Sequence, residues 1–255
     1  MTIISSLVIL LLIDMDLSER QKQLLKVIIE FYVKTGEPVA SDAIEKSSSL
    51  GVSPATIRNE MVTLTEMGFL KQPHVSSGRV PTAQGFRLYI GELMKEKELS
   101  IVDEVNIRQE MMDSRAQFGK MVHVAAKELA KKCDTLALSI NGDDIYYTGA
   151  ANILDLPEFF DIDVTRFVLS MLDEGAILEK VIGLAKGQEP LHVIFGEETE
   201  YEYLQPTSFA FLNFDTGRTD PGVIGVVGPN RLNFPLILPY LRYVGEVLNE
   251  AGRAM

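Results

Sequence analysis

Cysteine is almost absent from this chain, which excludes several classes of site. Cys133 is the sole cysteine in 255 residues, so the sequence offers no disulfide framework, no CxxC pair and no zinc cluster. The three histidines, His74, His123 and His192, lie far apart, and none has a second His or Cys at metal-ligand spacing. We therefore expect no metal, no other cofactor and a cytoplasmic location.

Long hydrophobic runs are also missing. Residues 3–13 are mostly apolar but too short for the roughly 20 residues of a membrane helix, and no basic start or cleavage site marks a signal peptide. Residues 1–16 are therefore a doubtful extension. We favour translation from Met15, which would make residues 1–14 dispensable; a weak anchor or an extra packed strand are the alternatives. No membrane contact is expected elsewhere.

Basic charge is scarce overall but unevenly spread. The formal net charge is −12, yet the segment from Ser18 to Ile90 holds nine Lys or Arg against seven Asp or Glu. The rest of the chain is therefore at −14. A near-neutral head on an acidic body is typical of some nucleic-acid binders. The length and the 46% hydrophobic content predict two modest globular domains.

The first ninety residues predict three helices followed by a hairpin. Residues 18–34 have a capping Ser18, an apolar stripe and a stop at residues 35–38. Ser41 caps a short helix, and Ser53 with Pro54 opens a third one that runs to Glu66. Strands are expected at 69–72 and 79–80, with a fourth helix from Thr82. This order predicts a winged helix-turn-helix over residues 17–94.

Two clusters of residues suit contact with DNA. The start of the third helix carries side chains that can approach a major groove, where Arg grips guanine and Asn pairs with adenine. The hairpin tip joins hydroxyls and a guanidinium to a flexible turn, which suits phosphate or minor-groove contact. An ordinary helical domain with solvated Arg58 and Asn59 is the alternative. The candidate DNA-binding residues are Ser41, Ser53, Ala55, Thr56, Arg58, Asn59, His74, Ser76, Ser77, Gly78 and Arg79.

The second half predicts an α+β domain. Residues 95–133 form linking helices, and residues 134–255 contain a hairpin around Asn141-Gly142, three further strands and a closing helix over 235–251. Gly225, Gly228 and Arg231 could cradle a phosphate, although a tight turn explains them equally well. The acidic residues at 197, 198, 200 and 202 are best explained as a solvated loop.

The stretches that suggest DNA binding also resemble one family. They are Leu17–Gln21, Thr35–Val39, Gly51–Met61 and Gln72–Thr82, and the later ones are Asn152–Leu154, Pro157–Phe159, Phe195–Glu198 and Gly225–Phe234. Together they cover most of the chain after Asp16 and resemble HrcA, the heat-inducible transcription repressor family. The two longest, Gly51–Met61 and Gln72–Thr82, are the most specific.

The resemblance implies a function and partners that the composition does not reveal. It implies a dimer that binds an inverted repeat upstream of chaperone operons, a GAF-like regulatory domain and assistance from the GroE chaperonin. We expect a repressor and not an enzyme. A regulator whose second domain senses a small metabolite remains the alternative, and an enzyme acting on a phosphorylated substrate ranks last.

The chain departs from the family in two ways. It is shorter, and the shortfall is expected between Cys133 and Ile145, where early strands and the inserted dimerisation module of the family would lie; Asn230 and Leu232 replace the usual Thr and Met. The second domain is therefore expected to be a reduced one. We still expect a homodimer, because a palindromic operator has two half-sites and each one binds one DNA-binding domain. The contact surface of this dimer is expected on the regulatory domain or on the linking helices, at Ile101, Val105, Met112, Phe118 and Val122.

Overall fold

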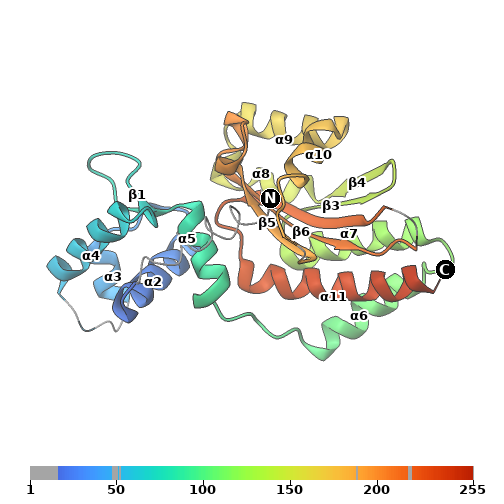
Figure 1. Ribbon diagram of the computed structural model, residues 1–255, viewed down its shortest axis with the longest axis horizontal. Helices are drawn as coiled ribbons and strands as arrows, with labels where there is room; N and C mark the ends of the chain where they lie inside the picture. The colour runs from blue at the N-terminus through green and yellow to red at the C-terminus, as the bar shows by residue number, and fades with distance from the viewer. Residues whose placement is uncertain (1–16, 48–50, 52, 188, 218–219, 255) are drawn as a thin grey trace, which may run out of the picture. The chain divides into compact units, whose positions relative to one another are not determined.

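Two compact units make up the chain, one ending at Met94 and one beginning at Lys95. The computed structural model (Figure 1) describes residues 17–47, 51, 53–187, 189–217 and 220–254. The expectation of a late start concerns residues 1–16 and lies outside this part. No helix of the described residues is long and apolar enough to cross a membrane.

Unit 1 opens with helix α2 (Glu19–Thr35), whose ends are fixed by local chemistry. The Ser18 hydroxyl accepts a hydrogen bond from the Gln21 amide, and the Gln21 side chain accepts one from the Ser18 amide. Gly36 ends the helix in the left-handed conformation at φ 73°. The capping box and the stop predicted from the sequence are therefore confirmed.

A helix-turn-helix and a wing complete unit 1. Helices α3 (Ser41–Ser47) and α4 (Pro54–Glu66) precede the antiparallel strands β1 (Leu70–Lys71) and β2 (Val80–Pro81). Helix α5 (Ala83–Leu88) follows and continues into the π-helical turn η1 (Tyr89–Leu93). The predicted winged helix-turn-helix is confirmed. Strand β1 is shorter than the expected 69–72, and β2 has the expected two residues but begins one residue later than predicted.

The core of unit 1 lies between these helices. Phe86 of α5 is buried and packs on Tyr32 of α2, with the ring centroids 6.4 Å apart. Burying a side chain of this size stabilises a fold by roughly 1.5–3 kcal/mol. The buried aliphatic side chains that complete this core are Leu24, Leu25, Ile28, Ile29, Ile57, Met61 and Leu64.

Unit 2 contains one five-stranded antiparallel sheet in the order β4-β3-β7-β6-β5. The strands are β3 (Leu136–Asn141), β4 (Asp144–Thr148), β5 (Leu191–Phe195), β6 (Thr207–Phe214) and β7 (Gly222–Pro229). Helices α7 (Phe118–Cys133) and α11 (Phe234–Arg253) cover one face, and α6 (Ile101–Met112) packs on both of them (Figure 1).

The opposite face of the sheet carries shorter helices (Figure 1). These are α8 (Ala150–Leu154), the 3-10 turn η2 (Pro157–Phe159), α9 (Ile162–Glu174) and α10 (Ala176–Ile182). Val168 and Met171 of α9 are buried against Leu136 and Phe209 of the sheet. Two further 3-10 turns, η3 (Gly196–Glu198) and η4 (Glu202–Leu204), lie between β5 and β6. The unit is an α+β domain, as expected.

One sequence expectation for the backbone of unit 2 is corrected. The charged segment after residue 95 is not helical up to Ser100, which caps α6 and accepts from the Asp103 amide at 3.1 Å. The strand predicted before Asn141-Gly142 is confirmed as β3, which follows α7 after two residues and pairs with both β4 and β7. The absence of other early strands and of a dimerisation module stays a prediction.

A carboxylate links the three helices on one face of unit 2. Asp103 of α6 accepts hydrogen bonds from Ser100 and Tyr240, each at 2.9 Å, and is paired with Lys132 of α7. The hydrogen bond from Lys132 is the main cause that lowers the pKa of Asp103 to about 2. The charged carboxylate therefore stabilises the fold above its ordinary pKa of 3.8, and this stabilisation is lost as the pH falls toward 2.

Replacing Asp103 by Asn should lower the melting temperature at neutral pH. The difference from the wild type should narrow as the pH falls from about 4 toward 2, because the wild-type carboxylate then becomes neutral as well. Thermal unfolding at a series of pH values measures this, with Asp143→Asn in the exposed β3–β4 turn as the control. A difference that is constant with pH would contradict the assigned role.

Candidate nucleic-acid interface

The first turns of α4 present polar side chains outward while their inner side is anchored in the core. Ile57 is buried, whereas Ser53, Ala55, Arg58 and Asn59 are exposed. The Ser53 hydroxyl accepts from the Thr56 amide at 3.2 Å and lies 3.0 Å from the Thr56 hydroxyl, which fixes the helix start. This is the arrangement expected of a recognition helix, with small residues beside an Arg and an Asn.

A cleft of about 340 Å³ lies between α4, the start of α3 and the wing. It brings together several of the residues predicted to contact DNA, namely Ser41, Arg58, Ser76, Ser77, Gly78 and Arg79. Ser53, Ala55, Thr56, Asn59 and His74 do not line it. Ser41 is buried and its hydroxyl donates to the Asp42 carboxylate at 3.2 Å, so its side chain already has a partner within the domain.

The base of the wing is held by backbone contacts. The Val39 and Arg79 backbones exchange two hydrogen bonds, of 2.8 and 2.9 Å. Gly78 comes so close to Val39 that a Cβ atom would lie 2.4 Å from its carbonyl oxygen. The Arg79 guanidinium donates from Nε to the Thr65 hydroxyl of α4 at 3.1 Å. Gly78 and Arg79 therefore support the wing, a role that their sequence positions did not reveal.

The wing tip is a β-turn with its own internal hydrogen bonds. The Ser77 amide donates to the His74 carbonyl at 2.9 Å, which places Val75 and Ser76 at the centre of the turn. Gln72 donates from Nε2 to the carbonyls of Val75 and Ser77, at 2.8 and 3.0 Å. Gln72 and Val75 were not identified from the sequence, because no local pattern distinguishes an amide side chain that hydrogen-bonds within a turn.

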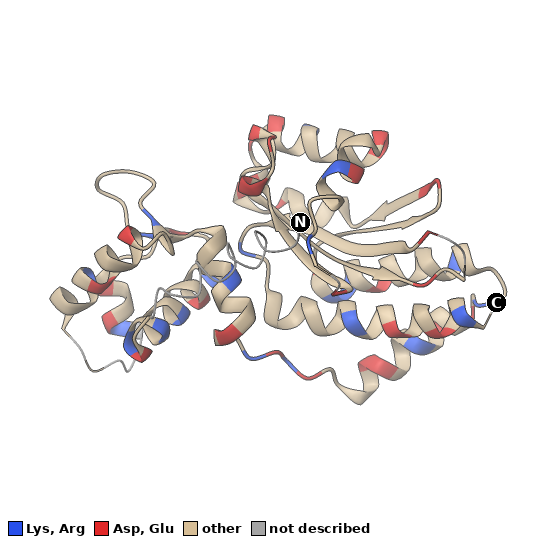
Figure 2. Ribbon diagram, in the orientation of Figure 1, with Lys and Arg blue, Asp and Glu red and all other residues tan. Residues whose placement is uncertain are grey.

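Charges of both signs are interspersed over α2, α3 and α4 (Figure 2). Arg20 of α2 forms an ion pair with Glu60 of α4, which neutralises an acidic side chain on the recognition helix. Within the described part of the chain, no acidic side chain pairs with Arg58. Arg58 is thus available for an external anion or base edge.

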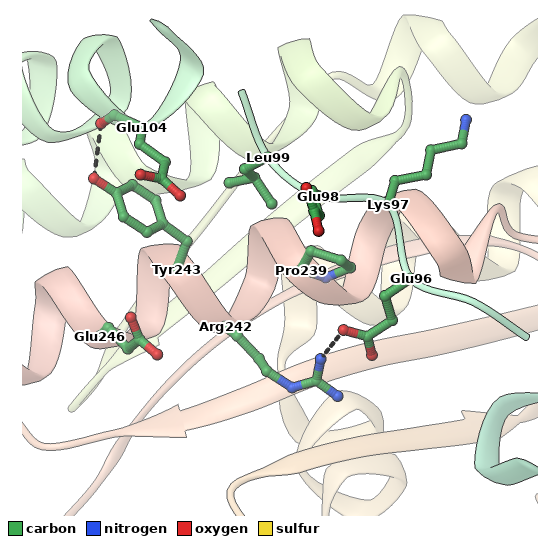
Figure 3. Close-up of a pocket in the computed structure, with 9 residues that line it drawn as sticks. All are labelled: Glu96, Lys97, Glu98, Leu99, Glu104, Pro239, Arg242, Tyr243 and Glu246. Atoms are coloured by element: carbon green, nitrogen blue, oxygen red, sulfur yellow. Dashed lines mark hydrogen bonds and ion pairs between the residues drawn. The ribbon is translucent and has the colours of Figure 1, made fainter. Parts of the chain in front are cut away.

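Unit 2 offers an open pocket of about 490 Å³ between residues 96–99 and the α6 and α11 helices (Figure 3). Arg242 is paired with Glu96, and the Tyr243 hydroxyl donates to the Glu104 carbonyl at 2.8 Å. The lining includes four glutamates against one Lys and one Arg. Such a lining repels a phosphorylated metabolite. It therefore supports neither an enzyme that acts on a phosphorylated substrate nor a sensor that binds an anionic metabolite.

The phosphate cradle considered for Gly225, Gly228 and Arg231 is wrong. Both glycines are paired inside β7, where a Cβ on Gly225 would lie 2.6 Å from Phe211. Arg231 binds Glu158 through two hydrogen bonds of 2.5 and 2.9 Å. These glycines therefore allow close packing in the sheet.

The acidic segment before β6 is a largely exposed loop. Glu197, Glu198, Glu200 and Glu202 are exposed, and Glu198 accepts from the Phe195 amide at 2.9 Å. Among the residues that the structure describes, no group of three His, Cys, Asp or Glu side chains could hold a metal ion.

Replacing Gly78 by Ala should displace the wing and destabilise unit 1. The added methyl would overlap the Val39 backbone, which cannot yield without breaking the hydrogen bonds to Arg79, so a loss of about 1–3 kcal/mol is expected. Urea unfolding of the full chain measures it. Gly91→Ala is the matched control, because a Cβ there has no neighbour within 4 Å. Equal stability of the two variants would contradict the packing argument.

Comparison with known proteins gives consistent family matches. Residues 16–92 match the family model of the winged helix-turn-helix transcription repressor, HrcA DNA-binding, and residues 56–237 match that of the HrcA protein C terminal domain. The heat-inducible transcription repressor HrcA of Acetivibrio thermocellus is 25% identical over 92% of this chain and 96% of its own length. The same repressor of Symbiobacterium thermophilum is 26% identical over 93% and 99%.

The alignments also report the difference in length. The one with the Acetivibrio protein runs over 338 positions, whereas 92% of 255 residues is about 235, so about 100 positions fall in gaps of this chain.

One solved structure supports the fold. It is a crystal structure described as that of a hypothetical protein, 16% identical, with a TM-score of 0.74 over 94% of this chain and 99% of its own. At that identity the likeness concerns the fold alone. The family rests instead on the two family matches, which together span the winged helix and most of unit 2. The chain belongs to the HrcA family of heat-inducible transcription repressors and is not an enzyme.

Proposed function

We propose that this repressor binds an inverted-repeat operator as a homodimer and silences heat-shock and chaperone genes. The observation that carries the proposal is the exposed start of α4, where Arg58 lines a cleft shared with the wing and Asn59 is exposed next to it in the sequence. Arg and Asn at the start of a recognition helix can read guanine and adenine through paired hydrogen bonds. We extend the proposal to the GroE chaperonin as a partner, on the strength of the family resemblance.

Two reading heads are needed because one head offers little electrostatic attraction. The segment from Ser18 to Ile90 has a net charge of only +2, and the whole chain is at −12. Few phosphates can therefore be neutralised per head, and non-specific affinity should be weak. A dimer holds the second head at a high effective concentration over the second half-site, which restores affinity without more positive charge.

The exposure of the candidate side chains supports one of the surfaces proposed for the dimer. Val122 is 1% exposed, and Phe118 is half-buried with its ring 6.2 Å from that of Phe214. These two side chains pack within one chain. Ile101 and Val105 on the first turns of α6 are instead 78% and 56% exposed, and Val102 beside them is 67% exposed. We therefore place the dimer contact at the start of α6.

Selection of bound duplexes from a random-sequence library tests the operator proposal. The selected sequences should share an inverted repeat, and the same repeat should occur in DNA that co-purifies with the protein from cells. Selection of unrelated sequences, or of no duplex above background, would overturn the proposal.

Substitution of the two arginines should separate base reading from phosphate contact. Arg58→Ala should weaken binding to the selected operator by about 1–3 kcal/mol and leave non-specific binding almost unchanged. Arg79→Ala should weaken specific and non-specific binding alike. It should also reduce the slope of log affinity against log salt concentration by about one unit. Gel shifts across salt concentrations measure both effects. Thr65→Val, which removes the hydroxyl bound by Arg79 but keeps the charge, controls for displacement of the wing.

Introducing negative charges at the start of α6 should separate the two subunits of the proposed dimer. Ile101→Asp with Val105→Asp should convert a dimer into a monomer, because two carboxylates would face their copies across the contact. Light scattering at micromolar concentration measures this with and without the duplex. Leu184→Asp, at another exposed apolar side chain of unit 2, should leave the dimer intact. A wild-type monomer that binds each half-site independently would refute the homodimer.

A further inference from the structure

We propose that Val75 at the wing tip determines specificity by selecting against G·C pairs in the minor groove beside the bases that α4 contacts. The inference rests on the proposed function, since it requires α4 to occupy a major groove. Val75 is 98% exposed, the highest value among the exposed large apolar side chains of the described chain. A wholly exposed isopropyl group at the tip of a DNA-binding hairpin gains nothing from the fold itself.

The turn that carries Val75 is held rigid from within. Gln72 binds the carbonyls of Val75 and Ser77 at once. The Ser77 hydroxyl donates to the His74 carbonyl at 2.7 Å and accepts from the His74 amide at 2.9 Å. The backbone on both sides of Val75 is therefore fixed before any ligand arrives. A preorganised tip loses little conformational entropy on binding, so a small apolar contact can affect the affinity.

The cleft defines where this tip meets the duplex. It separates Val75 and Ser76 on the wing from Arg58 and Val62 on α4. When α4 lies in a major groove, the sugar-phosphate strand that borders this groove passes through the cleft. The tip then lies over the minor groove beyond that strand. This groove is about 6 Å wide, and a two-residue turn is narrow enough to enter it.

The chemistry of the minor groove makes Val75 selective there. An A·T pair presents only acceptors in this groove, whereas a G·C pair adds the amino group of guanine. An isopropyl group that covers this amino group displaces its water and returns no hydrogen bond, which is unfavourable. His74 and Ser76, exposed on either side, can donate to the acceptors of A·T pairs. The tip should therefore prefer A·T pairs.

Substitution of inosine for guanine separates recognition in the minor groove from any effect in the major groove. An inosine·cytosine pair keeps the major-groove edge of G·C but lacks the guanine amino group. In the selected operator, each pair flanking the α4 contacts is changed in turn to A·T, I·C or G·C. The wild type should bind the A·T and I·C duplexes about equally, and the G·C duplex about 5- to 20-fold more weakly at the position beneath the tip.

Val75→Ser should reduce this discrimination to within about twofold, because a hydroxyl can accept from the amino group. Its melting temperature should not change, since the side chain is exposed. Leu184→Ser, the same kind of change at an exposed side chain of unit 2, should keep the wild-type preference. Arg58→Ala should weaken operator binding yet retain the preference for A·T over G·C in the flank.

Three outcomes would overturn the assignment to Val75. They are equal binding of A·T and G·C flanks by the wild type, an I·C duplex that binds as weakly as G·C, and a preference that survives in Val75→Ser. Each of them leaves the operator and the role of Arg58 intact. Failure of the wild type to select any operator would instead overturn the proposed function.

Discussion

The proposed DNA-binding face of this protein depends on the backbone bridge between Val39 and Arg79. The two residues are far apart in sequence, and their paired hydrogen bonds attach the wing to the segment that enters α3. Each strand of the wing has only two residues, so the hairpin alone would be unstable. The bridge and the Arg79–Thr65 hydrogen bond supply the missing support, and Gly78 makes the approach possible. Gly78 thereby determines the geometry of the cleft that we propose to take part in DNA recognition.

Local chemistry was predictable from the sequence, whereas contacts between distant residues were not. Ser18, Gly36 and Ser53 act through neighbours within four residues, and the structure places all three as caps. The bond from Arg79 to Thr65 joins residues 14 apart, and neither its donor nor its acceptor carries a local signature. Arg79 was therefore expected only as a DNA contact. Its position as a support of the wing became visible in the fold.

The glycines of β7 show that a local sequence pattern can also be misinterpreted. Their spacing near Arg231 left a phosphate cradle open beside a tight turn, because glycine also serves to bring a backbone close to a ligand. In the fold, the close approach is to Phe211 and to Leu232, whose Cδ2 would lie 2.5 Å from a Cβ on Gly228. Arg231 is meanwhile bound to Glu158 by two hydrogen bonds. A glycine pattern thus reports close packing, and only the fold reveals what is packed.

The shortness of the chain limits where a dimer contact can lie. All five strands of unit 2 join one continuous ladder, and only Asp134 and Thr135 separate α7 from β3. Asp134 makes this connection in the left-handed conformation at φ 50°, and Thr135 donates to the Val227 carbonyl at 2.8 Å. The sheet and its core therefore close without the additional segment that the aligned relatives contain. The proposed contact between copies is therefore assigned to the outer surface of the helices, where the start of α6 leaves apolar side chains exposed.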